Sequence, residues 1–218
     1  MRHLLGTTFT LLLVSPLVAA DAAQDAAQDP TQDKGWISIF DGKSLAGWKP
    51  NERPENWSVK DGAIVGSGAR SHLYYTKREL QDFEFRGDVM INKGGNSGIY
   101  FHIAHHPEGW FFDGHEVQIN NSHRDPVKTG SLWAVVKLYD SPVHDNEWFQ
   151  VHIRVSGQNI VVRLNGKIVV DYTEPKGAEG PRKIGRGYLA LQQHDPGSSV
   201  RFRNLAMKPL AAATPAKP

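Results

Sequence analysis

The residues best suited to chemistry lie in two short runs within residues 94–120. In each run apolar and polar side chains alternate, as they do along a β-strand whose side chains point to opposite faces. Tyr100 and His102 share a face of the first run, and Glu116 and Gln118 share a face of the second. Such groups on successive strands favour a polar pocket over a solvated face. A carboxylate in that pocket would serve as a general base.

A third run, residues 187–194, has the same character. Tyr188, Gln192 and His194 fall on one face of it, opposite two leucines. A histidine at a strand end is more often a hydrogen-bonded structural group than a catalyst, and a solvated carboxylate is the competing interpretation of Glu116. Taken together, the three polar strand faces predict one site to which His194 contributes.

Five of the ten histidines crowd into one segment: His102, His105, His106, His115 and His123. Their spacing matches no helix-borne zinc motif, and the chain has no cysteine, so a tight structural metal is not predicted. A weakly held divalent cation stays open, with Glu116, His102 and His194 as its ligands. No other cofactor is predicted.

Several functional classes are excluded by motif and charge. The chain has no Gly-x-Ser-x-Gly elbow, Walker loop or dinucleotide fingerprint, which argues against serine hydrolases, kinases and nicotinamide enzymes. The formal net charge is +2 and no basic block is interleaved with aromatic residues, so nucleic acid is not predicted as a partner. No amphipathic helix indicates a membrane surface. Six Trp and six Tyr suit a small sugar ligand.

The elements that must position these residues are short strands. The pattern predicts a hairpin at Asp61-Gly62 and another pair of hairpins over residues 148–172, with a turn at Asn165-Gly166. A further strand is expected at Leu132–Val135, and no helical period occurs outside the N-terminal segment. Short strands at regular spacing predict an all-β fold, an antiparallel β-sandwich, with a closed barrel as the alternative.

The domain organisation follows from composition. Residues 1–20 read as a secretory signal peptide, with a basic start, an apolar run too short to span a membrane, and small residues before the cut. Residues 21–33 and 211–218 read as a disordered linker and tail. Residues 34–210 form one domain. The protein is therefore expected in the periplasm or outside the cell, with no membrane span.

Residues 36–48 resemble the N-terminal signature of the 3-keto-disaccharide hydrolase family. Further motifs fall in that family's order: Asn96–Phe101, Glu116–Ile119, Leu164–Gly166, Leu191–Gln192 with His194, and Phe202–Asn204. The resemblance implies a concanavalin-like or laminin-G-like jelly roll. It also implies an exported bacterial enzyme that acts on glycosides whose C3 hydroxyl is oxidised to a ketone. His102 and His115 stand where the family commonly has other residues, which bears on substrate choice.

The chemistry implied is removal of the acidic C2 proton, elimination of the C1 aglycone and hydration, which is net hydrolysis. On this interpretation Glu116 is the base and His194 the acid. The sugar is then bound or oriented by Tyr100, His102, His115, Gln118, Trp133 and Gln192. Two alternatives are a carbohydrate-binding module without catalysis, in which aromatic residues stack on sugar rings, and a scaffold domain.

Overall fold

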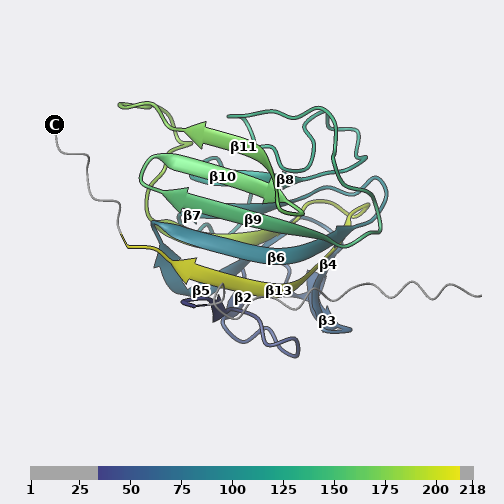
Figure 1. Cartoon of the computed structure of the whole chain (residues 1–218). Helices are drawn as coiled ribbons and strands as arrows, with labels where there is room; N and C mark the ends of the chain where they lie inside the picture. The colour runs from purple at the N-terminus through teal and green to yellow at the C-terminus, as the bar shows by residue number, and fades with distance from the viewer. Residues whose placement is uncertain (1–33, 212–218) are drawn as a thin grey trace, which may run out of the picture. The chain divides into compact units, whose positions relative to one another are not determined.

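The computed structural model describes residues 34–211, which form two antiparallel β-sheets. In Figure 1 the larger sheet lies in front and the smaller one behind it. The larger sheet has eight strands, in the order β11 (Lys167–Thr173), β10 (Asn159–Leu164), β9 (Phe149–Ser156), β6 (Phe83–Ile91), β13 (Ser199–Pro209), β4 (Ala63–Ser67) and β3 (Trp57–Lys60), with β1 (Ile37–Ser38) paired to β13.

The smaller sheet has five strands, in the order β2 (Trp48–Pro50), β5 (Ser71–Leu80), β12 (Gly187–Gln193), β7 (Ser97–Ile103) and β8 (His115–Ile119). One 3₁₀ turn, η1 (Pro54–Asn56), precedes β3. Because the strands divide between two separate sheets, the predicted all-β sandwich is confirmed and the closed barrel is not adopted.

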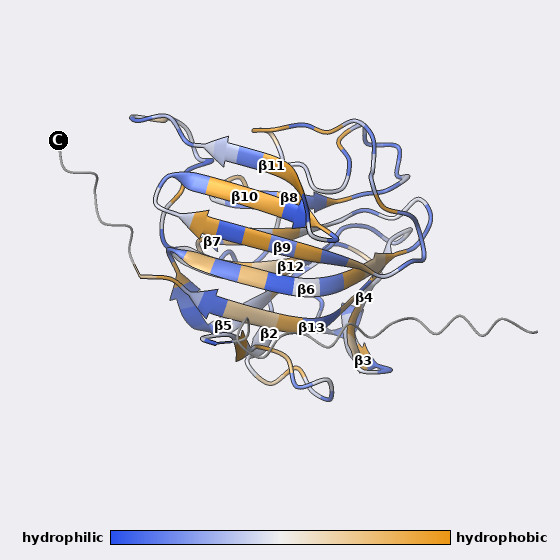
Figure 2. Cartoon of the chain, in the orientation of Figure 1, coloured by the Kyte–Doolittle hydropathy of each residue, from blue (hydrophilic) through white to orange (hydrophobic). Residues whose placement is uncertain are grey.

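The core lies between the sheets and follows from alternation. Phe83, Phe85, Val89 and Ile91 on β6 are buried, while the residues between them are partly exposed, apart from buried Gly87. The same alternation runs along β9, and Figure 2 shows it as alternating bands on both strands. Residues of both sheets join one apolar cluster. Each sheet therefore packs one face against the core, and its other face lies outside the core.

The predicted hairpins are present. Asp61 and Gly62, between β3 and β4, have φ values of 51° and 72°, and Asn165 and Gly166, between β10 and β11, have 47° and 79°. Positive φ at both central residues is the geometry of the tight turns that match strand twist. These turns fix the pairing of β3 with β4 and of β10 with β11 in the larger sheet, without involving the candidate residues.

The face of the smaller sheet that points away from the core, here called the pocket face, is built from rows across the strands. Tyr74 pairs with Ala190, Ala190 with Tyr100, and Tyr100 with Glu116. In the next row His72 pairs with Gln192, and Gly98 pairs with Gln118. Small residues at positions 98 and 190 leave a hollow between the large ones.

A bulge in β7 changes which side chains reach the pocket face. Ile103 pairs with Tyr188 and Tyr100 pairs with Ala190, so β7 has one more residue between these pairs than β12. His102 takes up the difference with a φ of 59°. As a result Ile103 lies in the same apolar cluster as Tyr100, whereas strict alternation along a strand would place it on the opposite face.

One predicted strand is wrong. Residues 132–135 form no strand, and only isolated bridges join Leu132 to Val117 and Val136. The segment runs beside β8, but Ala134 has a φ of 62° and the N–H groups of Val135 and Val136 bond back to the Leu132 carbonyl. The chain therefore turns where the apolar run suggested extension.

The predicted signal peptide (1–20) and linker (21–33), and all but the first residue of the predicted tail (211–218), lie outside the described residues. Within residues 34–211 no helix is long and apolar enough to cross a membrane.

Gly187→Ala should destabilise the protein by about 1–3 kcal/mol, as overpacking of a filled site usually does. A Cβ at position 187 would lie 2.5 Å from the Ile103 carbonyl oxygen, at the bulge. Gly185→Ala is the matched control, since nothing lies within 4 Å of its added Cβ. Urea denaturation of both variants checks this, and equal midpoints would contradict it.

Candidate active site

A pocket of about 250 Å³ lies on the pocket face. Its polar lining comes from β7, β8, β12 and the loops next to them: Asn96, Tyr100, Glu116, Gln118, Asp125, Arg182, Gln192 and His194. Its aromatic lining comes from loops: Trp110, Phe111, Phe112 and Trp133. Five predicted site residues besides Trp133 therefore meet here, from strands about 90 residues apart in the chain.

Glu116 is the buried carboxylate of this pocket, with 4% of its surface exposed. Burial raises the pKa of Glu116 to about 7, although Tyr100, which donates a hydrogen bond to it, and nearby Arg182 both favour the charged form. Its side chain occupies the hollow over Gly98, where a Cβ would lie 2.4 Å from the carboxylate oxygen Oε1. A glycine at position 98 is thus a condition for this carboxylate's position.

A hydrogen-bonded chain orients the neighbours of Glu116. Gln192 Nε2 donates to the Tyr100 hydroxyl at 3.0 Å, and Tyr100 in turn donates to the Glu116 carboxylate. Gln118 Nε2 donates to Asn96 Oδ1 at 3.1 Å. These bonds hold the amides and the hydroxyl in one arrangement, and among the described residues the buried Gln192 Oε1 has no hydrogen-bond partner.

His194 lies at the end of β12 and is held by the next residue. Its Nδ1 lies 2.7 Å from Asp195 Oδ2, and the backbone N–H of Gly197 donates to Oδ1 of the same carboxylate at 2.8 Å. Burial works against the charged form, but these hydrogen bonds hold the pKa of Asp195 below its usual value. The carboxylate therefore accepts a hydrogen bond from the Nδ1–H group and leaves Nε2 as the ring nitrogen that faces a ligand.

An aromatic wall is supplied by the loop between β7 and β8. Phe111 packs on His72 with ring centroids 4.0 Å apart, and Trp110 packs on His194 at 4.8 Å. Asp113 closes the loop by accepting a hydrogen bond from the Ala104 N–H at 2.8 Å.

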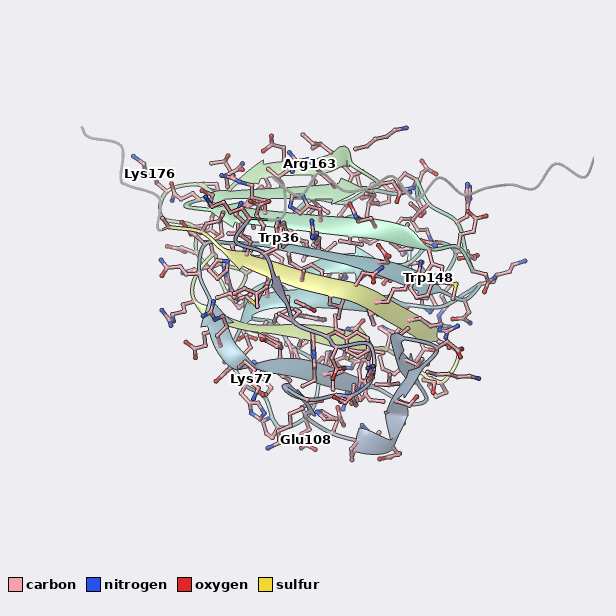
Figure 3. The ribbon with its side chains drawn as sticks, turned by 60° about the horizontal axis from the view of Figure 1, so that its bottom comes forward. Trp36, Lys77, Glu108, Trp148, Arg163 and Lys176 are labelled. Atoms are coloured by element: carbon pink, nitrogen blue, oxygen red, sulfur yellow. The ribbon has the colours of Figure 1, made fainter. Side chains whose placement is uncertain are left out.

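Figure 3 shows Glu108 of this loop at the bottom of the view, away from Arg163 of β10 at the top.

Trp133 and Arg182 also line the pocket. The Trp133 backbone N–H donates to the Glu116 backbone carbonyl at 2.9 Å, which holds residue 133 beside β8, and both side chains line the pocket. The Arg182 guanidinium lies 4.8 Å from the Trp133 ring centroid, a stacking distance for a cation and an aromatic face.

His102 and His115, predicted to contact substrate, do not line the pocket. The bulge turns His102 away, so that Nε2 lies 2.8 Å from the Gln81 carbonyl and Nδ1 accepts the Gly185 N–H. His115 precedes Glu116 in the strand and points to the core side, where its ring lies 5.5 Å from Phe101. Burial lowers the pKa of both histidines to about 4, so both are neutral at pH 7.

The candidate cation ligands are not brought together, because His102 lies away from Glu116 and His194. Among residues 34–211 no group of three His, Asp or Glu side chains is arranged to hold a metal ion.

Neither Arg182 nor His72 was predicted to belong to the site. Arg182 lies in a Gly/Pro-rich loop that has no period from which its direction could be inferred. His72 lies under Phe111, and both its ring nitrogens are buried without a hydrogen-bond partner among the described residues. Burial lowers the pKa of His72 to about 3, so it is a neutral group that packs behind Phe111 of the pocket lining. The alternation of residues 71–75 did contain that signal.

A family model described as "3-keto-alpha-glucoside-1,2-lyase-like domain" matches residues 35–208. The chain is also 33% identical, over 232 aligned positions, to a 3-keto-disaccharide hydrolase of Bacteroides thetaiotaomicron, and the match covers 81% of this chain and 79% of the relative.

Solved structures agree with the fold. A candidate glycosyl hydrolase from Parabacteroides distasonis superimposes with a TM-score of 0.72 at 25% identity, covering 84% of this chain and 97% of that one. The carbohydrate-binding module CBM66 from Bacillus subtilis superimposes with a TM-score of 0.57 at 15% identity, covering 74% and 95%. The second likeness concerns the fold alone.

The pKa of Glu116 predicts how stability depends on pH. The carboxyl is protonated up to about pH 7 when folded and only to about pH 4.5 when unfolded, so its favourable contribution is complete below the lower value and is lost as the pH rises through the upper one. Glu116→Gln should therefore be more stable than the wild type near pH 9, by at most about 3 kcal/mol. The difference should shrink towards about pH 5. Urea denaturation across this range checks it, and a difference independent of pH would contradict it.

Proposed function

The chain belongs to the family of 3-keto-α-glucoside 1,2-lyase-like domains, and on that premise we propose that it cleaves 3-keto-glycosides, with Glu116 as the base that removes the C2 proton. The observation that carries this proposal is the buried carboxylate of Glu116, whose pKa lies at about 7 inside a polar pocket. A base is most effective when its pKa is near the working pH.

The first step removes a proton from carbon. A ketone at C3 makes the C2 proton acidic, and Glu116 takes that proton while the C–H electron pair moves toward the C3 oxygen. The Tyr100 hydroxyl, donating to Glu116, holds the carboxylate in one orientation. A single carboxylate suffices, unlike the paired carboxylates of ordinary glycoside hydrolysis.

The second step breaks the glycosidic bond. The electron pair returns from the C3 oxygen, a C1–C2 double bond forms, and the C1–O bond breaks. We assign His194 as the acid that protonates the departing oxygen through Nε2, since Asp195 holds Nδ1 and stabilises the protonated ring. Water then adds across the double bond, with its hydroxyl at C1 and a proton at C2, which gives net hydrolysis.

The remaining polar groups position the ring. Gln118 and Gln192 line the pocket on either side of Tyr100, and amide groups both donate to and accept from sugar hydroxyls. Trp133 supplies an aromatic face of the kind on which a sugar ring stacks. Export to the periplasm or the medium remains a prediction from residues 1–20.

A second candidate function is sugar binding without catalysis. It is favoured by the exposed aromatic residues at the pocket, where Trp110 is 42% and Phe112 is 62% exposed. This alternative does not explain why Glu116 is buried, because an exposed carboxylate can accept hydrogen bonds from sugar hydroxyls without a desolvation cost.

The wild-type protein should release the aglycone from a 3-keto-glucoside but not from its unoxidised parent. Glu116→Gln should lower kcat by about 10²–10⁴-fold, the usual contribution of a general base, while binding persists. In the wild type kcat/KM should rise with pH through about 7 as Glu116 ionises. Deuterium at C2 should slow turnover, because the C2–H bond breaks. Sugar release followed with and without chelator gives these values.

The control is Glu55→Gln, at an exposed position in η1 that does not line the pocket; it should behave as the wild type. Binding with no turnover by the wild type would establish the sugar-binding alternative. Turnover by Glu116→Gln at the wild-type rate would remove the catalytic assignment. Release of an unsaturated sugar in place of the hydrated one would show that the reaction stops at elimination.

A further inference from the structure

Arg182, in the loop between β11 and β12, is a cation in the pocket that forms no ion pair with a carboxylate in the described part of the chain. Its Nη2 donates to the Phe111 carbonyl at 3.2 Å and its Nη1 to the Asp113 carbonyl at 3.5 Å. A guanidinium has five N–H donors, so these two contacts leave donors for a ligand.

Other stacked arginines in the molecule show that this is unusual. Arg70 lies over Trp110 and is paired with Glu52 at 2.9 Å. Arg203 lies over Trp148 and is paired with Asp88 at 3.3 Å. Each of these charges is compensated by a neighbouring carboxylate. Arg182 is stacked on Trp133 in the same way, but within residues 34–211 its hydrogen bonds go to backbone carbonyl oxygens and not to a carboxylate.

The charge of Arg182 reaches Glu116 without contact. Its field favours the ionised form of that carboxylate, and both side chains line the same pocket. When the carboxylate takes a proton from a substrate, the negative charge leaves Glu116 and appears on the substrate. An unpaired cation in the same low-dielectric pocket is then the group best able to stabilise it.

We propose that Arg182 donates hydrogen bonds to the substrate C3 oxygen as it becomes an enolate, and so acts as the oxyanion-stabilising residue. This inference rests on the proposed function. The electron balance is simple: the C2–H pair delocalises onto the C3 oxygen, Arg182 stabilises that charge without transferring a proton, and the pair leaves again when the C1–O bond breaks. The substrate class is a neutral sugar ketone, because the negative charge that Arg182 stabilises forms only during the reaction.

Arg182 also has a structural task that an experiment must separate. Its two carbonyl contacts tie the loop carrying Trp110, Phe111 and Phe112 to the loop 174–186. Arg182→Gln keeps a donor for these carbonyls but removes the charge, and Arg182→Lys keeps the charge but removes the planar fork. The matched control is Arg186→Gln, in the same loop, where Arg186 pairs with Glu79 outside the pocket.

With a 3-keto-glucoside, Arg182→Gln should lower kcat by about 10²–10³-fold, as loss of an oxyanion donor does, and change KM by less than about threefold. Arg182→Lys should recover part of kcat, and Arg186→Gln should match the wild type. Binding of the unoxidised parent glucoside, measured by calorimetry, should be unchanged in Arg182→Gln. In Arg182→Gln the rise of kcat/KM with pH should move to higher pH, because the cation that lowers the pKa of Glu116 is gone.

A raised KM together with weaker binding of the parent glucoside would overturn the proposal, since Arg182 would then hold the resting substrate or the loop. An unchanged kcat in Arg182→Gln, while Glu116→Gln is inactive, would overturn it and leave the proposed function intact. Absence of turnover by the wild type would instead overturn the proposed function itself.

Discussion

Removal of water from the Glu116 carboxylate is the constraint on which the site depends. An ionised carboxylate loses solvation when buried, and its proton affinity rises accordingly; here the pKa reaches about 7. Tyr100 and Arg182 return part of the lost stabilisation, which keeps the ionised form accessible near neutral pH. Gly98 gives the side chain room, and Trp133 lines the same pocket. Each neighbour of Glu116 thus either creates the dry space or moderates its effect.

The fold supplies this dry space on a sheet face that most sandwiches leave wet. The core between the sheets is complete without the pocket face, so that face is free to carry polar groups. The bulge at His102 then changes the local register, placing Ile103 beside Tyr100, and Gly114 and Gly187 leave room for the displaced backbone. Loops from both sides finish the enclosure, because a flat strand face could not exclude water alone.

The sequence revealed the site wherever the strand period held. Glu116, Gln118, Gln192 and Tyr100 were grouped correctly because a period of two leaves no choice of face once a strand is regular. His102 was misplaced because it has a positive φ itself and forms the bulge, which reverses the alternation of faces after it. The sequence has no glycine at this position that would indicate a bulge. Trp133 reaches the pocket from a turn that was predicted as a strand. Arg182 could not be placed, since its direction depends on which backbone carbonyls its loop meets.

The likeness of this fold to both hydrolases and binding modules poses the question of what separates the two functions. A sugar hydroxyl is recognised equally well by an exposed or a buried carboxylate, so recognition alone gives no reason to desolvate Glu116. Proton abstraction does, because the reaction moves a negative charge from the enzyme to the substrate and favours a base whose ionised form is not over-stabilised by water. In this pocket burial raises the pKa of Glu116, which favours transfer of a proton from the substrate to the carboxylate. The nearby unpaired Arg182 then stabilises the negative charge that appears on the substrate. The proposed chemistry therefore accounts for two costly features that binding leaves unexplained.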